Sequence, residues 1–250
     1  MSRFDQLLGT DFDDQPTSDA NEVIYGGLDH PEHQERVPGL VAIMNDSAAP
    51  DRERFLACLA LTTWGELAGY RAVGRAAESG RLTPSSVDST FAQLAIALGD
   101  SREMAAKKGT LAQRDSAFQA LVRIADTEYF EDQLGDLMDE STVRELLADI
   151  TETVTRGVNS LAGTAEAPPK FDLATQLVDL AGAVALVDGA LAARLAMTVL
   201  QVAPSPRALS HAVTVLYRST SPEARHLGEH VIAVGDERIR GMATDALHTT

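Results

Sequence analysis

Four short stretches of the chain share one helical pattern, and that pattern limits the folds open to the rest. Each has an arginine, a large apolar residue at +2, a usually small residue at +3, and apolar residues at +6 and usually +7. The arginines are Arg54, Arg144, Arg225 and Arg240. These offsets line one side of a helix, where small residues let a second helix approach closely. The pattern therefore predicts helices stacked in layers.

Composition and turn signals extend this prediction to the whole chain. Aromatic residues make up only 5% of the sequence, alanine and leucine dominate the apolar runs, and the alternation typical of strands is scarce. Short turn signals such as Asp188-Gly189, Ser219–Pro222 and Gly235-Asp236 separate the C-terminal helical segments. Connections this short make neighbouring helices antiparallel. We expect an all-α fold of antiparallel helix pairs.

Changes in composition along the chain predict its organisation. Residues 1–29 are acidic and are predicted to form a partly disordered N-terminal lead-in. Residues 30–162 are predicted to form a helical-repeat segment. A stretch rich in glycine, alanine and proline at 163–170 is the best candidate for a linker. Residues 171–250 then form a second helical-repeat segment.

The net charge of −16 is distributed unevenly. Residues 1–35 hold nine acids and one arginine, residues 126–152 hold ten acids and one arginine, and the remainder sums to +1. An acidic surface repels phosphate, and no basic cluster compensates, so nucleic-acid binding is not expected. The charge favours a basic protein partner, although acidity also serves simple solubility.

The second acidic region is interpreted as an amphipathic helix over Tyr129–Glu140. Its apolar residues Phe130, Leu134, Leu137 and Met138 fall at helical spacing, which places the acids on the opposite side. The alternative is an ordinary solvated helix face. The candidate partner-binding residues on the exposed side are Glu128, Tyr129, Glu131, Asp132, Asp136 and Asp139.

The stretch from Asp236 to Leu247 resembles the second helix of HEAT-type repeats, the armadillo-like or PBS-lyase group. Asp236, Ile239, Arg240, Ala243 and Leu247 match the layout of an acid, an apolar–arginine pair and an alanine-rich stripe. The resemblance implies an irregular, HEAT-like α-solenoid. The four arginines lie 90, 81 and 15 residues apart, so the repeats are degenerate, and a non-repeating helical bundle is the alternative.

Signatures of catalysis and metal binding are weak. The sequence has no nucleophile elbow, phosphate-binding loop or dinucleotide fingerprint. His226, Glu229 and His230 spell a zinc-protease motif, but both histidines lie opposite the apolar stripe of their predicted helix. We therefore predict no catalytic residue, no metal and no cofactor. No apolar run reaches the length of a membrane span, which favours a soluble, cytoplasmic protein.

These observations favour a non-enzymatic protein-interaction module that presents an acidic helical surface to a basic partner. An immunity or inhibitor protein and a scaffold are both compatible with such a role. Lysine accounts for three of 21 basic residues, which hints at a GC-rich bacterial genome. The resemblance implies an alternative, an enzyme of the chromophore-lyase or DNA-glycosylase type. The oligomeric state is left open.

Overall fold

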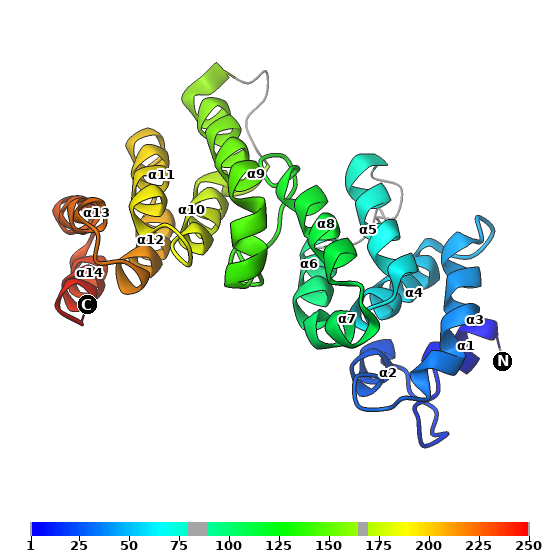
Figure 1. The fold of residues 1–250 in the computed structure, drawn as a ribbon. Helices are drawn as coiled ribbons and strands as arrows, with labels where there is room; N and C mark the ends of the chain where they lie inside the picture. Colours follow the sequence, from blue (N-terminus) through cyan, green and yellow to red (C-terminus); the bar gives the residue numbers. More distant parts are fainter. Residues whose placement is uncertain (1, 80–89, 165–169, 250) are drawn as a thin grey trace. The chain divides into compact units, whose positions relative to one another are not determined.

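The computed structural model describes residues 2–79, 90–164 and 170–249, which form helices joined by short connections (Figure 1). These described residues contain no β-strand, and their one isolated bridge pairs Thr10 with Pro16. The predicted all-α fold is therefore confirmed. The chain divides into two compact units, Met1–Leu121 and Val122–Thr250.

The first unit is built around one buried helix. Its described helices are α1 (Arg3–Leu8), α2 (Ala20–Gly26), α3 (His33–Asn45), α4 (Asp51–Thr63), α5 (Leu67–Ser79), α6 (Thr90–Asp100), α7 (Arg102–Lys108) and α8 (Leu111–Val122). Helix α4 packs against α2, α3, α5 and α6. Phe55 and the continuous run 57–63 of α4 are buried. Helix α4 thus supplies the core of this unit.

Trp64 closes the core at the end of α4. Its side chain is fully buried, and its Nε1 donates a hydrogen bond to the carbonyl of Ile24 at 2.7 Å. Gly27 lies directly against the indole, because a Cβ at that position would stand 2.4 Å from Nε1. Trp64 therefore fastens the end of α2 to the core, and a side chain at position 27 would prevent this packing.

The N-terminal segment contains more helix than its composition indicates. Ser2 caps a first short helix, α1, and Asp19 caps a second helix, α2. Between them, the side chain of Asp11 accepts hydrogen bonds from the backbone of Asp13 at 2.9 Å and Gln15 at 2.8 Å. The segment is thus organised by local capping and turn hydrogen bonds.

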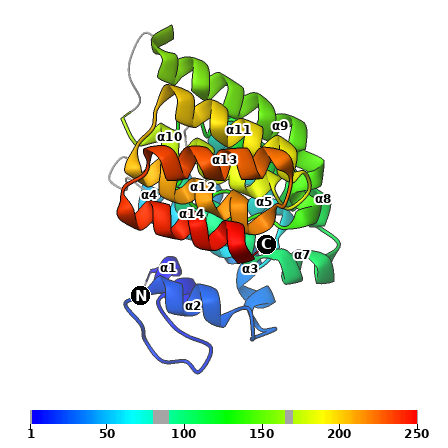
Figure 2. The same cartoon turned by 90° about the vertical axis from the view of Figure 1, so that its left-hand side faces the viewer.

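The second unit has a more regular plan. Its described helices are α9 (Glu140–Asn159), which runs into a short π-helical turn η1 (Ser160–Thr164), α10 (Leu173–Val184), α11 (Gly189–Val202), α12 (Pro206–Arg218), α13 (Pro222–Val234) and α14 (Glu237–Thr249). Helices α9, α11 and α13 pack side by side in one layer, and α10, α12 and α14 form the second layer (Figures 1 and 2). This is a two-layer stack of antiparallel helix pairs.

Spacing within this stack differs from the spacing of the arginine pattern. Helices α10, α12 and α14 begin at residues 173, 206 and 237, so successive starts are 33 and 31 residues apart. Arg225 and Arg240 lie on α13 and α14, which belong to different layers. The Arg240 Nε donates to the carbonyl of Gly235 at 2.9 Å, and Asp236 caps Ile239 of the same helix. These two residues therefore make local bonds at one helix start.

The division between the two units falls before the stretch expected to be a linker. Most of that stretch, 165–169, lies outside the described residues, so the linker stays a prediction. The flanking helices α9 and α10 pack against each other within the second unit. A linker there would join two packed helices of one unit.

Candidate functional site

The acidic segment 123–139 connects α8 to α9 through a series of turns, so the helix predicted over Tyr129–Glu140 is wrong. Glu131 and Asp132 have left-handed backbone conformations, with φ of 56° and 55°. An α-helix of L-residues does not contain such a pair. Of the four apolar residues predicted to face inward, Phe130, Leu134 and Met138 are nevertheless buried, and Leu137 is half-buried.

Side chains of α10 replace the backbone hydrogen bonds that a helix would have made. Gln176 accepts a bond from the N–H of Phe130 at 2.7 Å and donates from Nε2 to the carbonyls of Ala125 at 2.5 Å and Glu128 at 2.8 Å. One buried amide thus satisfies three backbone groups of the segment. This arrangement makes an irregular backbone tolerable in a buried place.

Asp179, one turn further along α10, holds the next part of the segment. Its Oδ2 accepts a hydrogen bond from the N–H of Gly135 at 2.7 Å, and only 7% of the residue is exposed. Gly135 passes so close that a Cβ would lie 2.4 Å from the Asp179 carbonyl oxygen. Burial raises the pKa of the Asp179 carboxyl well above its ordinary value.

The six predicted partner-binding residues do not form one exposed stripe. Asp132 is 3% exposed, and its Oδ2 lies 2.5 Å from Nη2 of Arg207 on α12. Burial raises the pKa of the Asp132 carboxyl, and Arg207 opposes that rise. Asp139 caps α9 by accepting bonds from the N–H groups of Ser141 and Thr142. Two of the five carboxylates among these six residues therefore support the fold.

The other four residues lie nearer the surface. Asp136 is exposed and pairs with Arg218 at 3.2 Å, and the ring of Tyr129 packs beside Phe171 at 5.4 Å between centroids. Glu128 is exposed and Glu131 is half-buried. Among the six predicted residues, Glu128 and Glu131 are thus the two for which the structure shows no ion pair, capping bond or ring contact.

Two further acids, one inside this segment and one on α9, are paired as well. Asp126 binds Arg156 at 2.9 Å, and Asp149 binds Arg123 at 2.7 Å. Much of the negative charge that the sequence concentrates in residues 126–152 is therefore neutralised within the unit. A count of acids in the sequence overstates the charge that this region offers to a partner.

The N-terminal segment, residues 2–35, is anchored by an arginine that bonds to its backbone. Arg36 of α3 donates from Nη1 to the carbonyls of Leu7 at 2.9 Å and Thr10 at 2.6 Å, and from Nη2 to the carbonyl of Asp11 at 2.7 Å. The same guanidinium lies 4.2 Å from the ring centroid of Phe12. The cation that anchors this segment therefore makes its hydrogen bonds to backbone oxygens, while the carboxylates of Asp14 and Asp11 attract it through charge.

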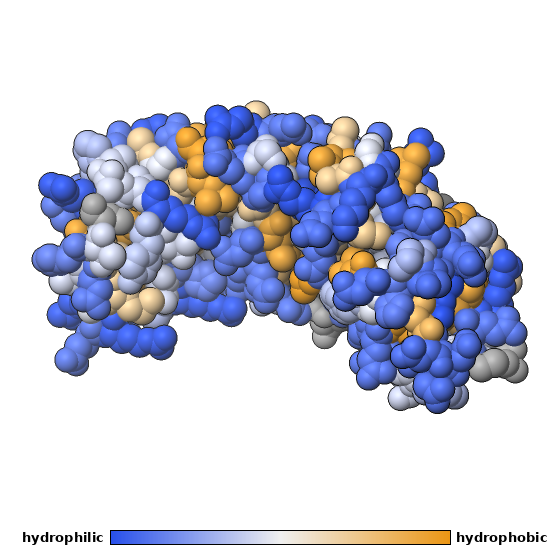
Figure 3. Space-filling view, turned by 60° about the horizontal axis from the view of Figure 1, so that its bottom comes forward, coloured by the Kyte–Doolittle hydropathy of each residue, from blue (hydrophilic) through white to orange (hydrophobic). Residues whose placement is uncertain are grey.

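Eight carboxylates of this segment are exposed. We call them the N-terminal acidic surface: Asp5, Asp13, Asp14, Asp19, Glu22, Asp29, Glu32 and Glu35. Asp5 and Asp19 cap α1 and α2, and Glu22 accepts a hydrogen bond from the hydroxyl of Thr17 at 2.5 Å. On the face drawn in Figure 3, hydrophilic residues cover most of the first unit, with hydrophobic ones in separate patches. This region is the stronger candidate for an acidic binding surface.

Sequence reasoning missed the residues that decide this difference. Gln176 and Asp179 stand three positions apart in α10, a helix whose twelve residues are all buried. Together with Thr175 they are three polar residues in a mostly apolar run, which is a signal, since buried polar groups need partners. Arg36 gave no comparable signal, because its partners are backbone oxygens 25 to 29 residues away.

Other site chemistries find little support in the geometry. Among the described residues, no cluster of three or more histidine, cysteine, aspartate or glutamate side chains is placed to hold a metal ion. His226 is exposed and lies 3.8 Å from Glu229 of its own helix. None of the described helices combines the length and the apolar character needed to cross a membrane.

Comparison with protein-family models, curated proteins and solved structures found no match to this chain. Function is therefore inferred from the residues and their contacts alone.

Proposed function

We propose that this protein is a non-enzymatic protein-interaction module, and that its N-terminal acidic surface binds a basic protein. The observation that carries the proposal is the anchoring of this segment by Arg36 through three backbone carbonyls. Because the hydrogen bonds of the anchor go to carbonyl oxygens, the exposed acids of the segment remain accessible to a partner.

Local structure supports the proposal by holding the acids in place before binding. The capping bonds of Asp5 and Asp19 fix the two helix starts, and the Asp11 side chain closes the loop between them. A surface that is already ordered loses less conformational entropy on association than a disordered one. Exposed charges of one sign also steer an oppositely charged partner and speed its encounter.

The segment around Glu128 is a weaker candidate for the binding surface. Several of its carboxylates are engaged with Arg207, Arg218 or the start of α9. A partner would have to compete with these contacts. We keep Glu128 and Glu131 as secondary candidates, because both are accessible and have no such contact.

The relation to HEAT-type repeats also remains a proposal. The stacking of α9, α11 and α13 over α10, α12 and α14 supports a repeat-like second unit. The spacing of 31 and 33 residues between helix starts is shorter than that of HEAT-type repeats, about 40–47 residues. Repeat stacks present extended surfaces, which suits a role in binding.

The experiment compares two variants that remove the same charge. Asp13→Asn, Asp14→Asn, Glu32→Gln and Glu35→Gln together neutralise acids whose side chains make no helix-capping hydrogen bond. The matched control carries Glu145→Gln, Glu229→Gln, Glu237→Gln and Asp245→Asn, which are exposed in the second unit and lie outside the segment around Glu128. A partner is first captured from native lysate and purified, and its affinity for both variants is then measured at two salt concentrations.

We expect the N-terminal variant to lose about tenfold or more in affinity, equal to about 1.4 kcal/mol, and the control to lose less than about twofold. Binding should weaken as salt rises, because exposed charges are screened beyond about 8 Å at physiological ionic strength. Equal losses in the two variants, or binding that ignores salt, would contradict the proposal.

A further inference from the structure

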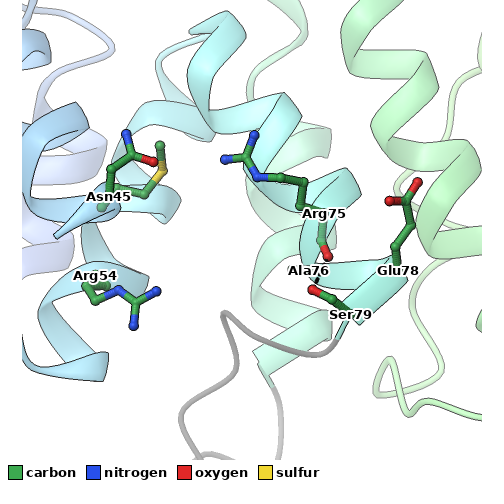
Figure 4. Close-up of a pocket in the computed structure, with 7 residues that line it drawn as sticks. Asn45, Arg54, Arg75, Ala76, Glu78 and Ser79 are labelled. Atoms are coloured by element: carbon green, nitrogen blue, oxygen red, sulfur yellow. Dashed lines mark hydrogen bonds between the residues drawn. The ribbon is translucent and has the colours of Figure 1, made fainter. Parts of the chain in front are cut away.

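A second kind of site lies in the first unit, where two arginines face a pocket. We call it the arginine pocket; its volume is about 350 Å³, within the range of small-molecule sites. The residues that matter to its chemistry are Met44, Asn45, Arg54, Arg75, Ala76 and Glu78. They come from the end of α3, the start of α4 and the end of α5 (Figure 4).

Two arginines supply the positive charge of the pocket. Its guanidinium groups belong to Arg54 on α4 and Arg75 on α5, and Figure 4 shows both extending into the space between these helices. Elsewhere, Arg36, Arg156 and Arg207 bond to carbonyls or carboxylates of other elements. Such contacts satisfy the cations within the fold and leave them little to offer a ligand.

The two pocket arginines are less completely satisfied. Arg54 pairs with Asp51 at 3.3 Å, but its Nε is buried without a hydrogen-bond partner. Arg75 is exposed and makes no hydrogen bond or ion pair through its guanidinium with any residue that the structure describes. A guanidinium has five N–H donors, so the exposed group of Arg75 and the Nη2 of Arg54 keep donors for a ligand. An anion with several oxygens is the natural acceptor for them.

The rest of the lining sets the shape of the ligand. Met44 and Ala76 are buried and give the pocket an apolar floor. Asn45 donates from Nδ2 to the carbonyl of Val41 at 2.8 Å, which leaves its Oδ1 able to accept a bond from a ligand hydroxyl. The pocket therefore presents guanidinium groups to an anion and a small, mostly apolar surface to the organic part of the same ligand.

Glu78 is the one carboxylate in the lining, and it limits the affinity for anions. In the view of Figure 4, its carboxylate is directed away from the two guanidinium groups. A phosphate monoester carries about −1.5 to −2 charges at neutral pH, whereas a simple carboxylate carries one. The more highly charged group gains more from two facing guanidinium groups.

We propose that the arginine pocket binds a small phosphate monoester that carries a hydroxyl group, with its phosphate between Arg54 and Arg75. The inference is independent of the N-terminal acidic surface, since the two use different residues. It gives this interaction module a small-molecule site of its own.

The test uses the full chain and isothermal titration with glycerol 3-phosphate as the probe, in a buffer without phosphate. Three comparison probes are used. Inorganic phosphate tests the phosphate group alone, glycerol tests the organic part alone, and lactate tests a ligand with a single negative charge. Arg75→Gln removes one pocket cation. Its matched control is Arg71→Gln, which removes an exposed arginine one turn earlier on the same helix, outside the pocket lining.

We expect glycerol 3-phosphate to bind more tightly than each comparison probe, and Arg75→Gln to weaken its binding about tenfold or more, while Arg71→Gln leaves it unchanged. Arg54→Gln should have a similar effect to Arg75→Gln, with circular dichroism checking that α4 stays folded. No binding of glycerol 3-phosphate at millimolar concentration, or equal losses in the Arg75 and Arg71 variants, would overturn the proposal. Equal affinity for inorganic phosphate would overturn the role assigned to the organic body.

Discussion

The two acidic segments of this protein, 2–35 and 123–139, are similar in composition but are held by different groups. In the first, a cation, Arg36, reaches into the segment and bonds to its carbonyl oxygens. In the second, the neutral amide of Gln176 bonds to two carbonyl oxygens and one N–H group, and Asp179 accepts a bond from another N–H group. Arginines of α12 pair with acids of this second segment. Whether the acids of a segment are accessible to a binding partner therefore depends on which groups anchor the segment. The number of acids in the sequence does not show this.

The largest predicted effect follows from the amide anchor of the second segment. Gln176→Leu would leave one N–H and two carbonyls of the segment without partners in a buried place. Each such group costs about 1–3 kcal/mol, so we expect a loss of about 3 kcal/mol or more. Chemical denaturation followed by circular dichroism measures this loss.

The control for this change is Gln201→Leu, which alters an exposed glutamine on α11 and should change stability by less than about 0.5 kcal/mol. If both variants were equally stable, the segment would not depend on Gln176, and the contrast between the two anchors would fail.

The cation anchor of the first segment should matter somewhat less. Arg36→Met removes three charge-assisted hydrogen bonds, but the half-buried site lets water replace part of them. We expect a loss of about 2 kcal/mol and faster amide hydrogen exchange in residues 2–29. Arg3→Met removes the same charge from an exposed position and should have little effect.

The variant Arg36→Met also tests whether binding of the basic partner requires an ordered acidic surface. Arg36→Met touches no carboxylate, yet it should weaken binding of the basic partner because the acids are no longer held in place. Unchanged affinity in Arg36→Met would show that the fixed arrangement of the acids is unimportant for recognition.

The two units should respond to pH in opposite directions. In the first, burial and then Lys108 lower the pKa of His33, while its bond to the His30 carbonyl acts the other way. The unfolded chain then binds a proton that the folded unit does not, so stability is present above the ordinary histidine value of 6.5 and is lost as pH falls below it. His33→Gln should flatten this dependence.

In the second unit, the pKa of Asp179 is raised above the ordinary value of 3.8. The folded unit then holds a proton that the unfolded chain releases, so stability is present below that value and is lost as pH rises through the folded pKa. Asp179→Asn should therefore be more stable than the natural chain at neutral pH, with a difference that shrinks toward pH 3.8.

One measurement separates these two responses. Trp64 is the single tryptophan and its ring lies 5.0 Å from that of His33, so its fluorescence reports the first unit. Circular dichroism reports the helices of both. Parallel pH dependence of the two signals would contradict the assignment of the two groups to separate responses.

The smallest effect concerns an exposed ion pair of the second segment. Asp136 and Arg218 lie 3.2 Å apart, but the aspartate side chain is largely in water. Asp136→Asn should therefore cost less than about 0.5 kcal/mol by chemical denaturation. A cost as large as that of Gln176→Leu would mean that surface pairing, and not the buried amide, holds the segment.

The sequence alone determined most of the helices, because their signals are local. Prolines and capping side chains mark the starts of α12 and α13, where Ser205 and Ser221 bond to N–H groups three residues ahead. The turn signals Asp188-Gly189, Ser219–Pro222 and Gly235-Asp236 lie at the starts of α11, α13 and α14. Such signals lie within a few residues of the feature that they specify.

Only the tertiary structure decided the form of the acidic segment 123–139. Its apolar residues have helical spacing, but its hydrogen-bond partners lie on α10, more than forty residues along the chain. The same holds for the arginine pocket, whose walls come from three helices. Periodicity shows which residues turn inward, whereas the partner of a buried N–H, or of a charge, depends on which distant element the fold places beside it.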